Sequence, residues 1–148
     1  MTQISNEEVA KRLPNAWIDQ DNVEFFRGLL QRKLLINRCD DCQRWHQPPW
    51  PNCPTCWSDD VTPTEVSGRG TIHSVSILRA GPPLDGVDYA AGYPVAVIEL
   101  EEQEGLRVTA TLVGGGADEL GIGTPVELAW IERDGEPLPA FGLRTDAA

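Results

Sequence analysis

Residues 39–56 read CDDCQRWHQPPWPNCPTC and contain all four cysteines of the chain. The cysteines form two pairs, Cys39 with Cys42 and Cys53 with Cys56, each separated by two residues. This spacing lets one tight turn present two sulfurs to the same ion, and two such turns complete a tetrahedron with Zn–S distances of about 2.3 Å. The stretch therefore predicts a small ribbon that binds one zinc ion through all four cysteines.

The predicted zinc site is structural, because four protein ligands leave no coordination position for water. Two alternatives remain for the same cysteines. They could be free or disulfide-linked, although a chain without an export signal favours a metal. They could also bind iron, since the same four-sulfur tetrahedron suits it. His46 is close enough to replace a sulfur, but with four cysteines already paired we expect it to be a bystander.

Tryptophans and prolines fill the rest of this stretch. A ribbon too small for a core of its own is expected to pack such rings against the metal turns and the neighbouring barrel. Exposed tryptophans would instead mark an interface or a flat ligand platform. The rings are Trp45, Trp50 and Trp57.

The sequence after the cysteines is typical of β-strands. Stretches rich in β-branched residues alternate with turn residues, which predicts at least four strands, with five or six expected, in a small closed barrel or sandwich. The predicted strands are 71–78, 94–100, 106–113 and 126–131, and the predicted breaks are 67–70, 80–91, 101–105, 114–116 and 134–135.

Two capping-box spacings before the cysteines predict two short helices. Glu8 follows Ser5 by three residues, so each side chain can satisfy the other's backbone donor at a helix start over residues 5–12. Asp21 and Glu24 repeat this spacing ahead of a second helix. The second helix is amphipathic, and its apolar stripe either packs within the chain or faces a partner. The stripe consists of Phe25, Phe26, Leu29 and Leu30.

A short strand over residues 34–38 is expected to lead into Cys39. A chain of 148 residues can bury enough surface to form one compact domain with a small appendage. The first twenty residues lack the apolar stretch of a signal peptide, and no apolar run approaches the ~20 residues of a membrane span. A cytoplasmic protein without a membrane segment is therefore expected.

Charge is unevenly distributed along the chain. Residues 1–58 carry seven acidic and seven basic side chains, so the whole formal charge of −11 comes from the rest of the sequence. Nucleic-acid binding requires a basic groove, and a barrel of this charge would repel the phosphate backbone. The composition therefore disfavours a nucleic-acid partner.

Candidate catalytic groups are few, and no catalytic residue is predicted. His73 lies in a predicted strand beside Ser74, where a lone histidine is most often structural. Residues 114–116 are glycines without the lysine of a phosphate loop, and they indicate a flexible connection. An acidic run before Gly105 is more simply a solvated turn than a carboxylate pair. It consists of Glu99, Glu101, Glu102 and Glu104.

Several of these segments, in this order, resemble the DUF35 family of zinc-ribbon OB-fold proteins over roughly residues 22–144. The order is specific, because helix, ribbon, Ser-Gly-Arg-Gly turn and closing strand must follow one another. The segments are FFRGL (25–29), LLINRC (34–39), PP (48–49) ahead of CPTC (53–56), VSGRGTIHS (66–74) and IGTPV (122–126). The resemblance implies a mainly β chain with a helical segment over 1–33, a rubredoxin-like zinc ribbon over 34–60 and an antiparallel OB-fold barrel over 61–148.

Proteins of that family are mainly accessory subunits. The resemblance implies no catalysis by this chain alone and a hetero-oligomer with a thiolase-like enzyme or a MaoC-like hydratase. Such enzymes include ones that shorten steroid side chains, and the barrel would lie near the acyl-CoA entrance. A nucleic-acid-binding module is the alternative, because ribbons and OB barrels often serve that purpose.

If this chain contacts acyl-CoA, it needs basic side chains that pair with the phosphates of the coenzyme. The candidates lie in the neutral first part of the chain, although each is more simply a solvated or salt-bridged surface residue. They are Arg27, Arg32, Lys33, Arg38 and Arg44. This sequence departs from the family at one point, since Gln43 and Trp57 stand where glycine commonly follows the second cysteine of each knuckle and a positive φ is convenient.

Overall fold

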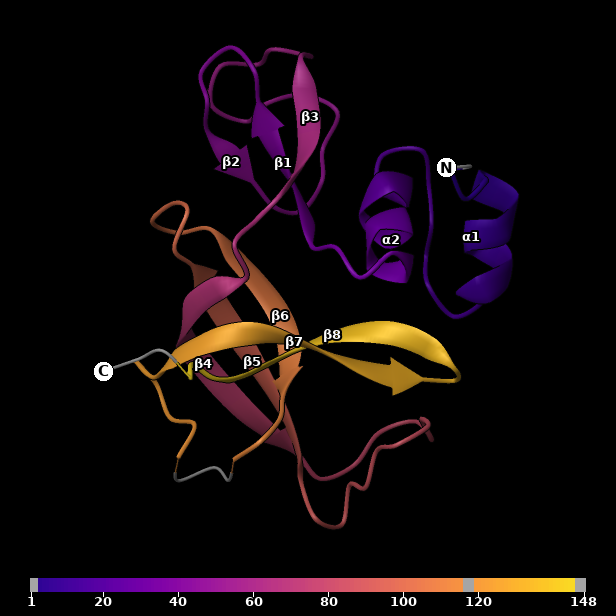
Figure 1. Ribbon diagram of the computed structural model, residues 1–148, viewed down its shortest axis with the longest axis vertical. Helices are drawn as coiled ribbons and strands as arrows, with labels where there is room; N and C mark the ends of the chain where they lie inside the picture. The colour runs from indigo at the N-terminus through magenta and orange to yellow at the C-terminus, as the bar shows by residue number, and fades with distance from the viewer. Residues whose placement is uncertain (1–2, 116–118, 146–148) are drawn as a thin grey trace. The chain divides into compact units, whose positions relative to one another are not determined.

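The computed structural model describes residues 3–115 and 119–145. Two short helices come first, followed by strands, which confirms the predicted mainly β chain (Figure 1). The chain divides into two compact units, one with the helices, β1–β3 and Glu136–Leu138, the other with β4–β7 and the rest of β8. The elements are α1 (Asn6–Arg12), α2 (Val23–Leu30), β1 (Leu35–Cys39), β2 (Trp45–His46), β3 (Val61–Glu65), β4 (Arg69–Leu78), β5 (Tyr93–Leu100), β6 (Arg107–Leu112), β7 (Pro125–Arg133) and β8 (Glu136–Leu143).

The first predicted helix is confirmed as α1. Ser5 is its N-cap, and the backbone N–H of Glu8 donates to the Ser5 hydroxyl oxygen over 3.2 Å. Such a bond satisfies one of the donors that a helix start leaves unpaired. The helix ends at Leu13, next to a proline that cannot continue it.

The second helix, α2, forms, but the capping box predicted for Asp21 and Glu24 is wrong. Asn22 occupies the N-cap position and makes no side-chain cap bond. Instead, the Asp19 carboxylate accepts hydrogen bonds from the N–H groups of Asp21 and Asn22 at 2.8 and 2.9 Å. Glu24 pairs with Arg27 rather than turning back to the cap. The turn before the helix is therefore closed by a side chain that the spacing rule does not consider.

The apolar stripe of α2 packs mainly within the chain. Leu30 belongs to a buried cluster with Val9 of α1, and Phe26 packs against that cluster. Leu29 is also buried, at 7% exposure. Of the two possibilities left open by the sequence, the structure favours intramolecular packing for most of this stripe.

The ribbon is a three-stranded antiparallel sheet in the order β2-β1-β3. The predicted strand over 34–38 is confirmed as β1, whose residue Cys39 pairs with Val61 of β3. β3 begins after residue 60, where the ribbon was predicted to end, but it pairs with β1 and so belongs to this sheet. It was not predicted, because its sequence VTPTE contains a proline; Pro63 is tolerated because β3 is an edge strand.

The second unit is a closed five-stranded barrel in the order β4-β5-β6-β8-β7. β6 and β8 run parallel, with Thr111 opposite Ala140, so the last strand inserts between the third and fourth, as in an OB fold. β4 pairs with both β5 and β7, and its register shifts between Ile72 and Ser74. Six strands follow the cysteines, as expected, although the sequence did not locate β8, whose prolines obscure its β pattern.

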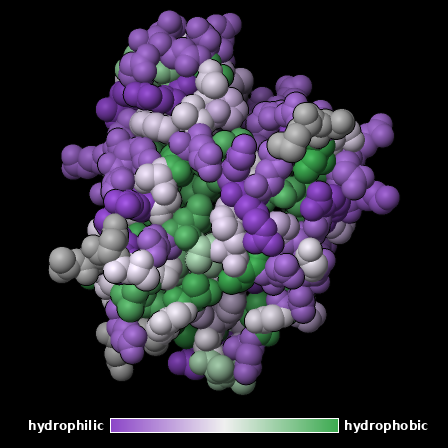
Figure 2. Space-filling model, viewed as in Figure 1, coloured by the Kyte–Doolittle hydropathy of each residue, from purple (hydrophilic) through white to green (hydrophobic). Residues whose placement is uncertain are grey.

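The core of the barrel is aliphatic, with one aromatic ring, the fully buried Phe141. In Figure 2 apolar residues also reach the surface over the barrel strands, whereas the face of the ribbon seen there is mostly hydrophilic. The buried side chains of this core are Ile72, Ala96, Ile98, Leu100, Leu106, Val108, Leu112, Leu120, Val126, Ala140 and Phe141.

Barrel closure should depend on Gly70, where β4 passes close to β5. A Cβ at this position would lie 2.4 Å from the carbonyl oxygen of Glu99 and 2.9 Å from a methyl group of Ile98. Because backbone cannot move aside cheaply, we expect Gly70→Ala to lower the free energy of unfolding by ~1–3 kcal/mol. Gly121→Ala is the matched control, since nothing lies within 4 Å of its added Cβ. Urea denaturation of both variants tests this, and equal stabilities would contradict it.

Candidate metal centre

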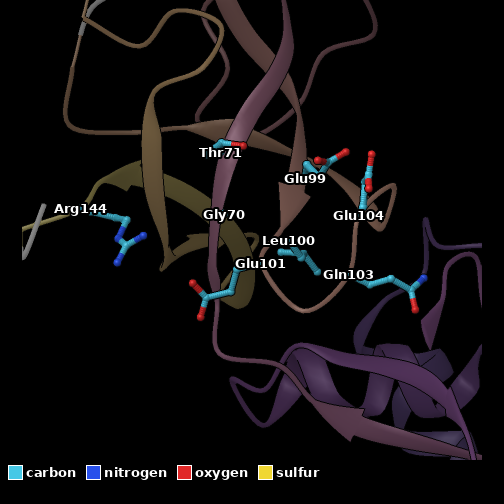
Figure 3. A pocket seen from close by; sticks show the side chains of 8 residues that line it. All are labelled: Gly70, Thr71, Glu99, Leu100, Glu101, Gln103, Glu104 and Arg144. Atoms are coloured by element: carbon cyan, nitrogen blue, oxygen red, sulfur yellow. The ribbon is translucent and has the colours of Figure 1, made fainter. Parts of the chain in front are cut away.

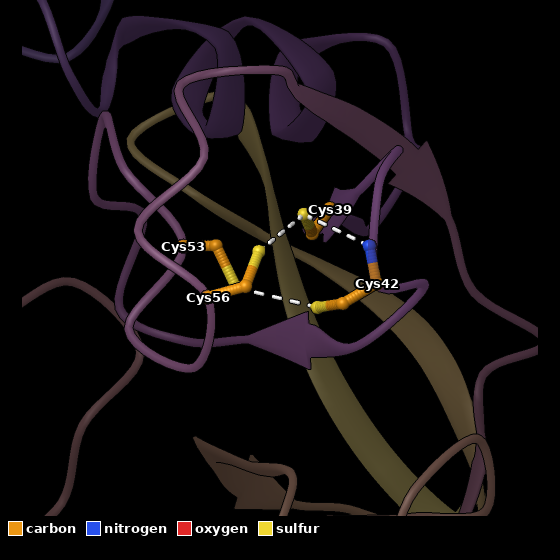
Figure 4. Close-up of side chains that lie close together, drawn as sticks. All are labelled: Cys39, Cys42, Cys53 and Cys56. Atoms are coloured by element: carbon orange, nitrogen blue, oxygen red, sulfur yellow. Dashed lines mark hydrogen bonds between the residues drawn. The ribbon is translucent and has the colours of Figure 1, made fainter.

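The structure brings the four cysteines together, as the spacing predicts (Figure 4). Their sulfur atoms all lie within 4.8 Å of one another, and the pairs Cys39–Cys56 and Cys42–Cys53 are 3.6 Å apart. A tetrahedron with arms of about 2.3 Å has edges of about 3.8 Å, close to these separations. A disulfide would require about 2.05 Å. The geometry therefore suits a shared metal ion and not a bridge between cysteines.

Both knuckles have the same backbone geometry. Gln43 and Trp57 adopt φ values of 67° and 66°, in the left-handed region where glycine is preferred. Their N–H groups donate to the carbonyl oxygens of Cys39 and Cys53 over 3.0 and 2.9 Å. The departure from glycine at these two places leaves the turn intact, at some conformational cost.

The cysteine thiols differ in acidity before any metal binds. The pKa of Cys53 is lowered to about 6, mainly because the backbone N–H of Cys56 stabilises its thiolate. At Cys56 the N–H of Ser58 acts in the same direction, but desolvation and the neighbouring sulfurs outweigh it and raise the pKa to about 12. One thiolate forms readily, but its negative charge disfavours deprotonation of the neighbouring thiols. A divalent cation removes that opposition, because its charge stabilises every thiolate in the cluster.

His46 is not part of the cysteine group in the described part of the chain. It is buried, and its Nε2 lies 3.2 Å from the carbonyl oxygen of Trp50, on whose ring it stacks. Arg38 lies over the ring of Trp45, with 5.2 Å to the centroid. The prediction that the tryptophans pack is wrong for Trp50 and Trp57, which are 48% and 77% exposed.

Arg27, one of the five candidate cations, is committed to the fold and not to a ligand. It is 5% exposed, and its Nε donates to the carbonyl oxygen of Ile4 over 2.7 Å. Its other nitrogens bond to Glu24 and Asn6. The amphipathic pattern placed Arg27 on a polar face, but the loop before α1 covers that face.

Three residues of the acidic run, Glu99, Glu101 and Glu104, line a cavity of about 200 Å³ on the barrel (Figure 3). The Glu99 and Glu101 side chains point in different directions from the end of β5, and Arg144 approaches from another segment. Glu99 accepts hydrogen bonds from the Gly105 N–H and from Arg107 Nε, both over 3.3 Å. The contacts of Glu99 stay within this turn and the start of β6. Glu102 departs from the predicted solvated turn, because its carboxylate accepts a hydrogen bond from the Ser67 N–H over 2.6 Å.

A second cavity of about 240 Å³ is mostly apolar, with Arg79 as the one charged side chain in its lining. Its walls come from β4, β5, β6 and the loops around them, so no local sequence pattern indicates it. The lining residues are Val75, Ile77, Arg79, Ala91, Gly92, Pro94, Leu112, Gly115 and Leu120. Such a cavity can accept an apolar group beside an anionic one.

No helix among the described residues is long and apolar enough to cross a membrane.

His73, the histidine considered for catalysis, is exposed on β4 where the strand register shifts.

Comparison with protein families matches two consecutive parts of the chain. Residues 26–62 match the ChsH2 rubredoxin-like zinc ribbon domain, and residues 63–131 match the ChsH2 C-terminal OB-fold domain. The chain is also 40% identical over 129 residues to a probable enoyl-CoA hydratase alpha subunit of Thermomonospora curvata. That match covers 86% of this chain but 39% of the relative, so the chain spans well under half of that protein.

Two further relatives match over most of their own length. A DUF35 domain-containing scaffold protein of Methanothermobacter thermautotrophicus is 33% identical over 120 residues, covering 78% of this chain and 87% of the relative. Among solved structures, a chain of the Ltp2-ChsH2(DUF35) aldolase is 37% identical with a TM-score of 0.76. This alignment covers 87% of the present chain and 98% of that chain.

We expect the purified protein to hold about one zinc ion per chain, and Cys39→Ser or Cys56→Ser to lose both metal and thermal stability. A structural zinc ion contributes folding free energy directly, and a serine hydroxyl is a poor replacement for a thiolate. Elemental analysis and thermal unfolding measure the two effects. Stoichiometric iron, or a cysteine variant with unchanged stability, would contradict the structural-zinc prediction.

Proposed function

Because this chain belongs to the DUF35 family of zinc-ribbon and OB-fold proteins, we propose that it is a non-catalytic subunit of a cytoplasmic acyl-CoA enzyme. In this proposal the chain binds a thiolase-like partner, such as a thiolase, aldolase or acyltransferase, and helps to form the entrance for its acyl-CoA. The catalytic residues belong to the partner. Steroid side-chain degradation is one pathway in which such an enzyme acts.

The observation that carries the proposal is the shared order of ribbon and barrel in a chain of a solved aldolase. The likeness extends over 98% of that chain at 37% identity, so it includes both units rather than a common barrel alone. The relatives named above are a hydratase subunit and a scaffold protein. One name is that of a subunit of an acyl-CoA enzyme and the other that of a scaffold, and the proposal combines the two.

The metal centre supports this role by holding the ribbon rigid. We propose that Cys39, Cys42, Cys53 and Cys56 bind one Zn²⁺, which fixes the two knuckles relative to each other. A closed four-sulfur site presents no open position at which a substrate could bind. In this proposal the chain contributes a binding surface for the partner, and the zinc ion stabilises the conformation of that surface.

On the barrel, the apolar cavity near Arg79 is suited to part of an acyl-CoA. Its volume of about 240 Å³ falls below the ~300–1,000 Å³ of sites that enclose a whole ligand. It could therefore line one side of an entrance and leave the partner to supply the rest. The Arg79 guanidinium in its lining offers a charge partner to an anionic group of the coenzyme.

Nucleic-acid binding is the alternative, and the fold by itself permits it. The charge of the chain opposes it, because neutralising phosphates releases counterions only when the protein supplies cations. The formal charge is −11, and a four-thiolate zinc site adds negative charge to the ribbon.

We predict that the chain binds a thiolase-like protein encoded beside it and has no acyl-CoA turnover alone. The two proteins should elute together as a larger species, and turnover should rise when they are combined, because the partner carries the chemistry. Size-exclusion chromatography and an acyl-CoA assay on each component and the mixture measure this. If no such neighbour binds, or this chain alone converts an acyl-CoA, the accessory role is wrong.

Single-stranded oligonucleotides should bind with a Kd weaker than about 1 µM even at low salt, since electrostatic attraction supplies most non-specific affinity. Fluorescence anisotropy at low ionic strength tests this prediction. Salt-sensitive nanomolar binding would instead favour the nucleic-acid alternative.

A further inference from the structure

Trp57 combines two features that are each unfavourable for an isolated ribbon. Its φ of 66° lies in the left-handed region, which bulky side chains avoid because Cβ approaches the backbone too closely. Its side chain is 77% exposed, and in the described part of the chain no ring stacking, cation–π contact or hydrogen bond engages the indole. A glycine would fit the same turn with less strain and less exposed apolar surface.

Gln43 holds the equivalent place in the first knuckle and differs in this respect. Its φ is 67°, but its side-chain amide donates to the carbonyl oxygen of Asp40 over 2.7 Å. This bond offsets part of the strain within the ribbon. The contacts of Trp57 are backbone ones, to Cys53 and to the side chain of Asn52, and they would remain if the indole were removed.

Acidic residues lie in the segments next to the second knuckle, which carries Trp57. The carboxylate of Asp41, from the first knuckle, accepts a hydrogen bond from the hydroxyl of Ser58, which follows Trp57. The Asp40 N–H donates to the carbonyl oxygen of Asp60 over 2.8 Å, so the acidic segments 40–41 and 59–60 lie together. The pKa of Asp60 is raised, mainly by its hydrogen bond to Asp40 and by the charge of that residue, as expected of crowded carboxylates.

A four-thiolate zinc site in the same knuckles carries further negative charge, since four thiolates outweigh one Zn²⁺ by two charges. An exposed indole in such a field attracts cations in two ways. The face of the ring binds a guanidinium or ammonium group, and the surrounding carboxylates steer a basic surface toward it.

We propose that Trp57 is the anchor through which the zinc ribbon docks onto a basic surface of the partner enzyme. An arginine or lysine of the partner covers the indole, and Asp41 and Asp59 face further basic groups at the edge. This inference rests on the proposed accessory role and specifies which surface of the ribbon the partner uses. Buried tryptophans are frequent hot spots of interfaces, and complementary charge sets the approach and the register.

The test exploits the opposite effects expected on folding and on binding. Trp57→Gly removes the anchor but relieves the left-handed strain, so its thermal midpoint and zinc content should equal or exceed those of the natural protein. Its Kd for the partner should weaken by about 30-fold or more, the effect of losing a ~2 kcal/mol hot spot. Gln43→Gly is the matched control, because it changes the equivalent knuckle position without removing an aromatic ring. It should bind the partner as the natural protein does.

Titration calorimetry with the partner, at low and high salt, separates the possible outcomes. Binding of the natural protein that weakens with salt, together with a specific loss in Trp57→Gly, supports the docking surface. Unchanged affinity of Trp57→Gly, an equal loss in Gln43→Gly, or salt-insensitive binding would overturn it while leaving the accessory role in place. If the natural protein binds no thiolase-like partner, the accessory role is wrong and this inference falls with it.

Discussion

Four sulfur atoms within 4.8 Å of one another cannot all be thiolates unless a cation shares them, and the form of the ribbon follows from this requirement. To present the sulfurs, each knuckle turns sharply, and the residue after its second cysteine takes a positive φ whether or not it is glycine. β1 delivers Cys39, and its pairing with β2 and β3 holds the knuckles at one end of the sheet. A sheet of such short strands has little core of its own, so a bound metal ion would supply cohesion that packing cannot.

The barrel is held by different means. β4 pairs with β5 along most of its length, and its first residues, 69–71, pair with β7 as well, which closes the sheet on itself. Closure brings β4 so near to β5 that Gly70 has no room for a side chain. The interior is filled by aliphatic residues and Phe141, and an apolar cavity opens beside Arg79. The barrel is therefore a packed and acidic body whose surfaces suit contact with another protein better than contact with nucleic acid.

These two units together suit a supporting role more than a catalytic one. A metal ion held by all four cysteines would have no open coordination position, and Glu99 and Glu102 are engaged in hydrogen bonds within the barrel unit. Two features distinguish the surface: an exposed tryptophan close in sequence to acidic residues on the ribbon, and an apolar cavity on the barrel whose lining includes Arg79. Each feature would bury more apolar surface, and pair more of its charge, in contact with a complementary surface of another protein. This is the physical basis for placing the chemistry in a partner and the recognition in this chain.

The sequence by itself determined the features that depend on residues near one another in the chain. The four cysteines, the Ser5 cap of α1, the strand leading into Cys39 and most barrel strands follow from local spacing and β-branched composition. Tertiary structure decided what depends on distant residues. Arg27 is buried by the loop that contains Ile4, and the proline-rich β8 is a strand because β6 and β7 pair with it. The exposure of Trp57 is also tertiary, because composition shows that a ring is present but only the surrounding fold determines whether anything covers it.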